Sequence, residues 1–211
     1  MTKGSLIIVR HGRTASNAQG LLQGRADNPL DEVGIAQAEA VGDHLAAEVA
    51  EAAVIISSPL VRARGTADLI AARTGLAVEV DERWIEVSYG VFEGVPQADV
   101  PAETWDRWRS DPHFSPENGE ALSDVQRRVA AACDELLESL AGRTAIVVSH
   151  VSPIKSAVVW ALGVDVGVSW RTQLDTASMT RISLTGRGPV LRSFNESARP
   201  RPDRSGSDAG H

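Results

Sequence analysis

The chain has 211 residues, 43% of them hydrophobic and 23% charged, which suits a soluble α/β domain that buries a full core. The net charge of −7 argues against nucleic acid as the main partner, and no apolar run reaches the length of a membrane span. The single cysteine, Cys133, excludes an internal disulfide. Because the N-terminus enters a strand directly, we expect a cytoplasmic protein, either a monomer or a homodimer.

The first element is an apolar run at residues 6–9, which is typical of a strand buried on both faces in a parallel sheet. It runs directly into Arg10, His11 and Gly12. In open α/β sheets, ligands bind beyond the carboxyl ends of the strands. The chain therefore begins by placing a cation and an imidazole where such folds carry out chemistry.

Next comes the polar, glycine-rich segment 14–28, which is predicted to be a loop. A helix follows, with Asp31 as its cap. Its apolar face is marked at helical spacing by Ile35, Ala38, Val41, Leu45 and Val49. A second buried strand is predicted at residues 53–57.

The strand at 53–57 ends in Ser58-Pro59, and proline suits the first turn of a helix that continues to about residue 73. Arg62 falls in that first turn. A short third strand is expected at 76–80. The N-terminus of the helix at Ser58-Pro59 is expected to add positive potential to the same edge of the sheet.

The second half of the chain begins with an irregular stretch and a proline-rich segment that contains one short helix. Further elements are then predicted: helices at 121–140 and 153–160, a buried strand at 144–149, and a β pair at 179–184 and 189–194. Strands alternate with helices, so the predicted fold is α/β and doubly wound, with a mainly parallel sheet flanked by helices. We expect one domain at 1–196, with a small cap insertion at about 87–119 and a disordered tail at 197–211.

Two of the buried strands end in histidine, His11 and His150, and both should open on the same edge of the sheet. Arg10 and Arg62 are expected to join them in one crevice. Cations this close repel one another, and an anion would relieve that repulsion. A phosphoryl group, with three outer oxygens, is the natural occupant.

Four motifs in this order resemble those of the histidine phosphatase superfamily, which includes phosphoglycerate mutases, bacterial acid phosphatases and α-ribazole phosphatases. They are Arg10-His11-Gly12, the segment 57–63 that contains Arg62, the segment 85–90 that contains Glu86, and Ser149-His150. The resemblance covers about residues 5–195 and implies a phosphoglycerate mutase-like fold. One departure is Val151 directly after the second histidine, where many members have glycine.

The resemblance implies that His11 is the nucleophile and becomes phosphohistidine. A nucleophilic imidazole must be neutral, and the nearby cations disfavour its protonated form. Arg10, Arg62 and His150 would hold the phosphoryl oxygens and the charge of the transition state. Asn17 best matches the contact that the family takes from the loop after the first histidine, and Gln23 is a second candidate.

Glu86 matches the proton donor of the family and would protonate the leaving oxygen before activating water. Glu82 is a nearby rival. Tyr89 is a further candidate for substrate binding. The cap aromatics Trp105, Trp108 and Phe114 either stack on a substrate ring or form the packing of the cap, and the second interpretation is favoured.

The sequence therefore predicts a phosphomonoester hydrolase that acts through phosphohistidine on a small phosphorylated metabolite. Two alternatives stay open: phosphoglycerate mutase-type phosphoryl transfer and a catalytically weak phosphate-binding module. Only 64 positions separate Glu86 from His150 (150 − 86), which is short for a mutase. We expect no metal and no cofactor, no nucleic acid partner and no membrane association, with a small phosphate monoester as the ligand.

Overall fold

The computed structural model describes residues 2–48 and 52–198, and these form an α/β fold around one six-stranded sheet. The strand order is β3-β2-β4-β1-β5-β6. Its strands are β1 (Thr2–Arg10), β2 (Ala52–Ser57), β3 (Val78–Val80), β4 (Thr144–Ser149), β5 (Ser178–Thr185) and β6 (Gly188–Ser197). Strands β1 to β4 run parallel to one another, β5 pairs antiparallel with β1, and β6 pairs antiparallel with β5. The predicted doubly wound, mainly parallel sheet is confirmed.

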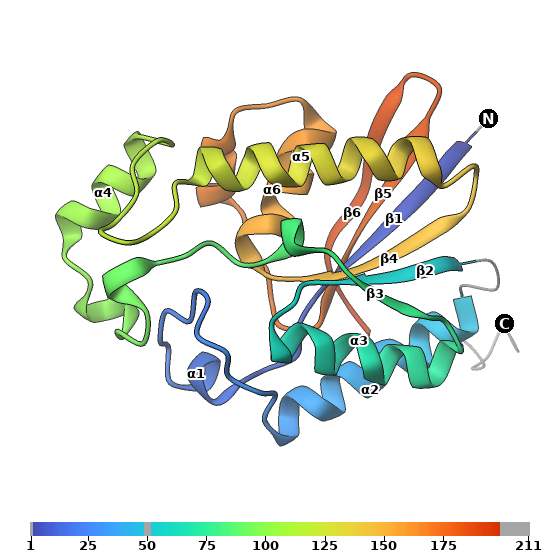
Figure 1. Ribbon diagram of the computed structural model, residues 1–211, viewed down its shortest axis with the longest axis horizontal. Helices are drawn as coiled ribbons and strands as arrows, with labels where there is room; N and C mark the ends of the chain where they lie inside the picture. Colours follow the sequence, from blue (N-terminus) through green and yellow to red (C-terminus); the bar gives the residue numbers. More distant parts are fainter. Residues whose placement is uncertain (1, 49–51, 199–211) are drawn as a thin grey trace, which may run out of the picture.

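Helices cover both faces of the sheet (Figure 1). One face carries α2 (Glu32–Glu48) and α3 (Val61–Thr74), and the other carries α5 (Leu122–Ser139) and α6 (Val151–Leu162). Two shorter helices, α1 (Ala15–Ala18) and α4 (Ala102–Ser110), lie at the end of the molecule to which the parallel strands point. Among the described residues, no helix combines the length and the hydropathy needed to traverse a bilayer.

The central strand β1 is buried on both faces, as its unbroken apolar run predicts. Leu6 and Ile8 belong to the core under α5 and α6, whereas Ile7 and Val9 belong to the core under α2 and α3. This alternation follows from the period of two in a strand. All four side chains are at most 4% exposed, so β1 is fixed rigidly where it delivers the residues that follow it.

The helix α2 has its predicted cap but a shifted buried face. The Asp31 carboxylate accepts the Gly34 N–H at 2.8 Å, which is the expected N-cap contact. Ile35, however, is 43% exposed, because the buried face begins one residue earlier at Gly34, where the backbone of Arg13 comes close. Val49 lies outside the described residues.

Three further boundaries differ from the sequence prediction. The expected loop 14–28 contains α1, whose Thr14 and Asn17 form a reciprocal capping box. α3 begins at Val61, so Pro59 precedes the helix. Ser197, predicted to begin the tail, is the last residue of β6, and residues 199–211 lie outside the described part of the chain.

The cap, residues 87–119, is held by its own aromatic cluster. Trp108 is 3% exposed and packs with Val100 and with Leu22 of the loop that follows α1. Its ring meets Tyr89 edge-on at 5.5 Å and lies 5.3 Å from that of Trp105. The interpretation of Trp108 as packing of the cap is thus confirmed.

Candidate active site

The two predicted site histidines lie side by side because β1 and β4 are neighbouring parallel strands. Arg10 of β1 pairs with Ser149 of β4, so each strand is followed by a histidine at the same edge of the sheet. The His11 N–H donates to the Ser149 carbonyl over 3.0 Å, and the two histidine ring centroids are 5.1 Å apart. Topology thus brings together residues that are 139 positions apart in the chain (150 − 11).

The His11 ring is fixed in one tautomer. Its Nδ1 lies 2.7 Å from the Gly12 carbonyl, which can only accept, so Nδ1 carries the proton and Nε2 presents its lone pair. Burial, together with the charges of Arg10 and Arg62, holds the pKa of His11 well below its ordinary value. The ring is therefore neutral at pH 7, as a nucleophile requires.

Gly12 allows the loop after His11 to lie directly on α2. A Cβ at this position would lie 2.3 Å from the Gly34 carbonyl oxygen, which is backbone and has little room to shift. The Gly12 N–H donates to the Thr66 hydroxyl of α3 at 3.0 Å. The glycine of the first motif thus serves close packing, and α2 and α3 together hold the carbonyl that orients His11.

Arg62 lies deep in the site, and backbone carbonyls hold it in place. It is 1% exposed, and its two terminal nitrogens donate to the carbonyls of Gly24 and Ala26 at 2.7 and 2.8 Å. Arg10 similarly donates to the Leu174 carbonyl at 2.6 Å. Burial lowers the pKa of both guanidinium groups, although arginine stays charged in proteins.

His150 has a different partner from His11. Its Nε2 lies 2.7 Å from the Ser58 hydroxyl, and its ring is completely buried. Burial and the charge of Arg62 hold the pKa of His150 well below its ordinary value, so this ring is neutral too. Ser58 belongs to the second motif, but nothing in its residue type alone signals this contact.

Three buried nitrogens of this cluster have no hydrogen-bond partner within the described residues: Arg10 Nε, Arg62 Nε and His150 Nδ1. Buried donors are almost always paired in folded proteins. Unpaired nitrogens on three residues around His11, two of them N–H donors of arginine, match a ligand rich in acceptor oxygens. We call these residues, with His11, the phosphoryl cradle.

The expected helix N-terminus is not part of the cradle. Because α3 begins at Val61, its first free N–H groups come after Ser58 and Pro59. The Val61 N–H donates to the Asp27 carboxylate at 2.6 Å. The prediction that Ser58-Pro59 adds helix-dipole potential is wrong, since Pro59 lies before the N-cap and an acidic side chain occupies the helix start.

Asn17 and Gln23 both contact the hydroxyl of Thr14. Thr14 was not among the site residues predicted from the sequence. That hydroxyl lies 3.1 Å from Asn17 Oδ1 and 2.9 Å from Gln23 Oε1, and the two amide oxygens share its single O–H donor. Each amide therefore uses its oxygen to shape the loop and keeps its NH₂ group for other acceptors. The pattern Thr14-x-x-Asn17 is the sequence signal for this capping arrangement.

Glu86 is 6% exposed, and its side chain contacts the first residues of α6. Its Oε1 accepts from the N–H groups of Val87 and Ser152 at 2.9 and 3.1 Å, and its Oε2 accepts from Val151 N–H at 3.1 Å. Two of these donors are the first N–H groups of α6, immediately after His150, so the side chain of Glu86 caps this helix. Glu82, the rival, is exposed in the 3₁₀ turn Glu82–Trp84.

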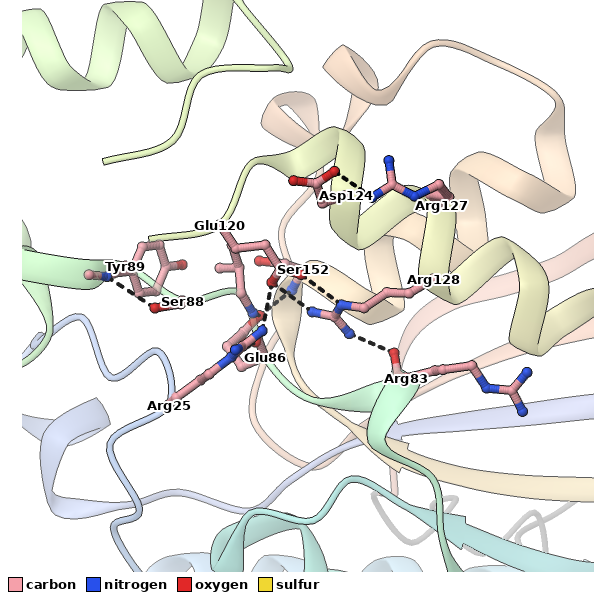
Figure 2. Close-up of polar contacts among 12 residues, drawn as sticks. Arg25, Arg83, Glu86, Ser88, Tyr89, Glu120, Asp124, Arg127, Arg128 and Ser152 are labelled. Carbon is pink, nitrogen blue, oxygen red and sulfur yellow. Dashed lines mark hydrogen bonds and ion pairs between the residues drawn. The ribbon is translucent and has the colours of Figure 1, made fainter. Parts of the chain in front are cut away.

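A bridge of charged side chains holds the backbone next to Glu86 (Figure 2). Glu120 accepts from Arg128 through both carboxylate oxygens at 3.0 Å and from Arg25 at 3.1 Å. Arg128 also donates to the Arg83 carbonyl at 2.6 Å, and Arg25 to the Glu86 carbonyl at 3.4 Å. The bridge joins α5, the loop after α1 and the segment that carries Glu86.

Tyr89 lies at the base of the cap, and burial raises the pKa of its hydroxyl. Together with Lys155 of α6 it lines a small cavity next to Glu86. Lys155 was not among the predicted site residues. It is one of only two lysines in the chain, and it follows His150 by five positions, on the first turns of the helix that Glu86 caps.

Comparison with known proteins shows the family of this chain. Residues 6–197 match the model of the histidine phosphatase superfamily (branch 1). A bifunctional protein of Mycobacterium tuberculosis is 38% identical over 182 residues, which cover 85% of this chain and 50% of that protein. Phosphoserine phosphatase 1 of Hydrogenobacter thermophilus is 34% identical over 194 residues, 90% of this chain and 91% of that protein.

Among solved structures, a mycobacterial glucosyl-3-phosphoglycerate phosphatase aligns with a TM-score of 0.81 at 29% identity, covering 92% of this chain and 99% of that one. This chain thus spans about half the length of the M. tuberculosis relative and nearly the full length of the other two.

Proposed function

This chain belongs to the histidine phosphatase superfamily, and we propose that it hydrolyses small phosphate monoesters through a phosphohistidine at His11. The observation that carries the proposal is the state of His11: a buried neutral ring whose Nδ1–H donates to Gly12, so that Nε2 faces the cradle as a nucleophile. A purely phosphate-binding module would need cations but no neutral imidazole fixed in this tautomer.

In the first step, Nε2 of His11 attacks phosphorus and the bond to the ester oxygen breaks. The unpaired N–H groups of Arg10, Arg62 and His150 supply donors for the outer oxygens of the phosphoryl group. His150 can donate from Nδ1 when the Ser58 hydroxyl donates to its Nε2, which the separation of 2.7 Å supports. The amide groups of Asn17 and Gln23 add donors from the loop.

Glu86 transfers the protons. Its Oε1 already accepts two N–H groups, whereas Oε2 accepts one, so Oε2 keeps one acceptor position. We assign that position to the proton that passes to the leaving alcohol. In the second step the Glu86 carboxylate takes a proton from water, the oxygen of water attacks phosphorus, and the bond to His11 breaks with release of inorganic phosphate.

The proposal is tested by trapping the phosphohistidine intermediate in base, in which its N–P bond is stable. Wild-type protein incubated with a ³²P-labelled monoester and quenched in base should carry base-stable, acid-labile label, and His11→Ala should carry none. Inorganic phosphate should be released without any bisphosphoglycerate primer. Efficient isomerisation of phosphoglycerate with negligible phosphate release would establish the mutase alternative, and two equally inert, unlabelled proteins would establish the binding module.

We also propose a cytoplasmic enzyme that acts as a monomer or a homodimer. The free, buried thiol of Cys133 supports a reducing compartment. Cell fractionation tests the location, and light scattering coupled to size-exclusion chromatography tests the subunit number.

A further inference from the structure

The peptide bond between Gly12 and Arg13 connects His11 to the helix α2. Its carbonyl oxygen, that of Gly12, lies 2.7 Å from Nδ1 of His11. Its N–H, that of Arg13, donates to Oε1 of Gln37 over 2.9 Å. The described residues contain no cis peptide bond, so the C=O and the N–H of this peptide point in opposite directions. One rigid planar unit therefore lies between the imidazole and the side chain of Gln37.

The helix α2 holds this peptide by close packing as well. Gly34 precedes Gln37 by three positions, so the two residues share a face of the helix. A Cβ on Gly34 would lie 2.7 Å from the Arg13 nitrogen and would overlap the Arg13 carbonyl oxygen, so only glycine fits there. The Asp31 N–H donates to the same carbonyl oxygen over 3.0 Å. The backbone of Arg13 is thus fixed against α2, within reach of Gln37.

The side chain of Gln37 supplies the acceptor for the Arg13 N–H. No other hydrogen-bond acceptor for this N–H is found within residues 2–48 and 52–198. Hydrogen bonds in a row polarise one another, so an acceptor on the N–H side makes the carbonyl of the same peptide a stronger acceptor. A stronger bond from Nδ1–H to that carbonyl holds the His11 ring in the tautomer in which Nε2 is unprotonated, and it makes Nε2 richer in electrons.

We propose that Gln37 is a positioning residue for the nucleophile, and that it fixes the orientation and the tautomer of His11 through the Gly12–Arg13 peptide. Gln37 lies outside the phosphoryl cradle and takes no part in the bond changes at phosphorus. This inference rests on the proposed phosphohistidine mechanism and adds a side chain of α2 to it.

The main variant is Gln37→Met, which keeps the length of the side chain and removes the acceptor. The rate constant for phosphohistidine formation, measured by rapid quench at pH 8, should fall by about 3- to 10-fold, the range for one neutral hydrogen bond. The fall should be the same for an alkyl phosphate and for p-nitrophenyl phosphate, because both react with the same nitrogen. The inhibition constant of inorganic phosphate should stay at its wild-type value, because the donors of the cradle are unchanged.

The matched control is Gln126→Met. Gln126 is also a half-buried glutamine on a helix, α5, but its Oε1 has no hydrogen-bond partner in the part of the chain that the structure describes. Its replacement should leave the rate constant unchanged. Gln37→Glu keeps an acceptor oxygen and should retain at least about half of the wild-type rate constant.

A spectroscopic measurement separates positioning of the ring from general stability. ¹⁵N NMR of the wild type should show His11 protonated at Nδ1, whereas Gln37→Met should show a measurable share of the form protonated at Nε2. Gln126→Met should match the wild type. Thermal unfolding of the variants is recorded alongside, because a loss of stability alone would leave the tautomer as it is.

Hydrogen exchange of the Arg13 amide tests the contact without any variant. In the wild type this N–H should exchange with solvent at least about tenfold more slowly than an unprotected amide. Slow exchange would support the bond to Gln37 even if Gln37→Met did not fold. Exchange at the rate of an unprotected amide would overturn the proposal.

An unchanged rate constant and an unchanged tautomer in a folded Gln37→Met protein would also overturn the role of Gln37. So would an equal loss of rate in Gln126→Met. In each of these cases the wild type would still form labelled phosphohistidine, and the proposed function would stand. Absence of the label in the wild type would instead refute the proposed function.

Discussion

The phosphoryl cradle and the cap are built by different physical means. In the cradle, Arg10, His11 and Arg62 each contact backbone carbonyls, and His11 and His150 are at most 3% exposed. Their positions follow from strand ends and helix starts, which tolerate little movement. In the cap, aromatic rings pack on one another, and the charges of α4 lie at the surface.

This difference separates the residues that carry out the reaction, in the cradle, from those that select the substrate, in and around the cap. Groups that must meet a transferring phosphoryl group need positions accurate to fractions of an ångström. Groups that contact the alcohol part of the substrate only have to enclose it. Substitutions in the cradle should therefore affect all substrates alike, whereas substitutions in and around the cap should affect substrates differently.

The largest effect is expected from Arg62→Ala. Loss of a donor to transition-state charge should lower kcat by about 10²- to 10³-fold for alkyl and aryl phosphates alike. Arg62→Lys keeps the charge but loses the planar fork that reaches Gly24 and Ala26, so it should restore little. The control is Arg73→Ala at the other end of α3, whose side chain pairs with surface carboxylates. The measurement is steady-state kinetics on both esters. If the loss of kcat differed strongly between alkyl and aryl phosphates, Arg62 would not be acting on the phosphoryl group that all substrates share.

Glu86→Gln should show the next largest effect, and it should depend on the leaving group. Formation of phosphohistidine from an alkyl phosphate should slow by about 10²-fold or more, because the poor leaving oxygen needs a proton. The burst from p-nitrophenyl phosphate should change far less. Rapid-quench measurements separate this step from the later hydrolysis. Glu82→Gln, an exposed neighbour, should behave as the wild type. Equal losses on both esters would argue against the acid role.

A third effect concerns stability and pH. His11 and His150 have pKa values well below the ordinary 6.5 in the folded protein, so below pH 6.5 the unfolded chain binds two protons that the folded chain does not. The free energy of unfolding should therefore fall with falling pH, by up to about 1.4 kcal/mol per pH unit for each ring. Urea unfolding between pH 7.5 and 5 measures the slope.

Replacing one ring, as in His150→Gln, should remove that ring's share of the slope. A variant with an unchanged slope would show that the buried rings take up protons as readily as in the unfolded chain, which would contradict the neutral state of the cradle.

The smallest effect is expected where the cap joins the cradle. Glu120→Gln weakens a bridge whose members Glu120 and Arg128 are 15% and 17% exposed, and it should cost on the order of 1–2 kcal/mol of stability and a few-fold in kcat/KM. Asp124→Asn breaks an exposed pair with Arg127 nearby (Figure 2), and should cost less than about 0.5 kcal/mol. Chemical unfolding and kinetics of the two variants give the comparison, and equal costs would show that the bridge positions nothing.

Much of the cradle could be predicted from the sequence because its residues directly adjoin strongly patterned elements. His11 and His150 each follow an apolar strand, and the period of the strands together with the parallel topology places both at one edge. The contacts of Ser58 and Thr14 could not be predicted, since a hydroxyl is compatible with many partners and the chosen one depends on three-dimensional packing.

The dependence on three-dimensional packing also explains the two sequence predictions that were wrong. Ile35 has the spacing of a buried residue, but the close approach of Gly12 and Gly34 turns α2 so that Ile35 faces solvent. Pro59 has the residue type of a helix start, yet Asp27, from a loop about 30 positions earlier, caps a helix that begins two residues later.

The sequence by itself determined the doubly wound fold class, the positions of the buried strands along the chain and the two imidazoles at their ends, because hydrophobic periodicity and strand termini are local properties. Only the tertiary structure decided that Glu86 caps the helix after His150, that carbonyls of a distant loop hold Arg62, and that Lys155 faces the cavity beside Glu86. Those facts depend on contacts between segments far apart in the chain, whose geometry no local pattern encodes.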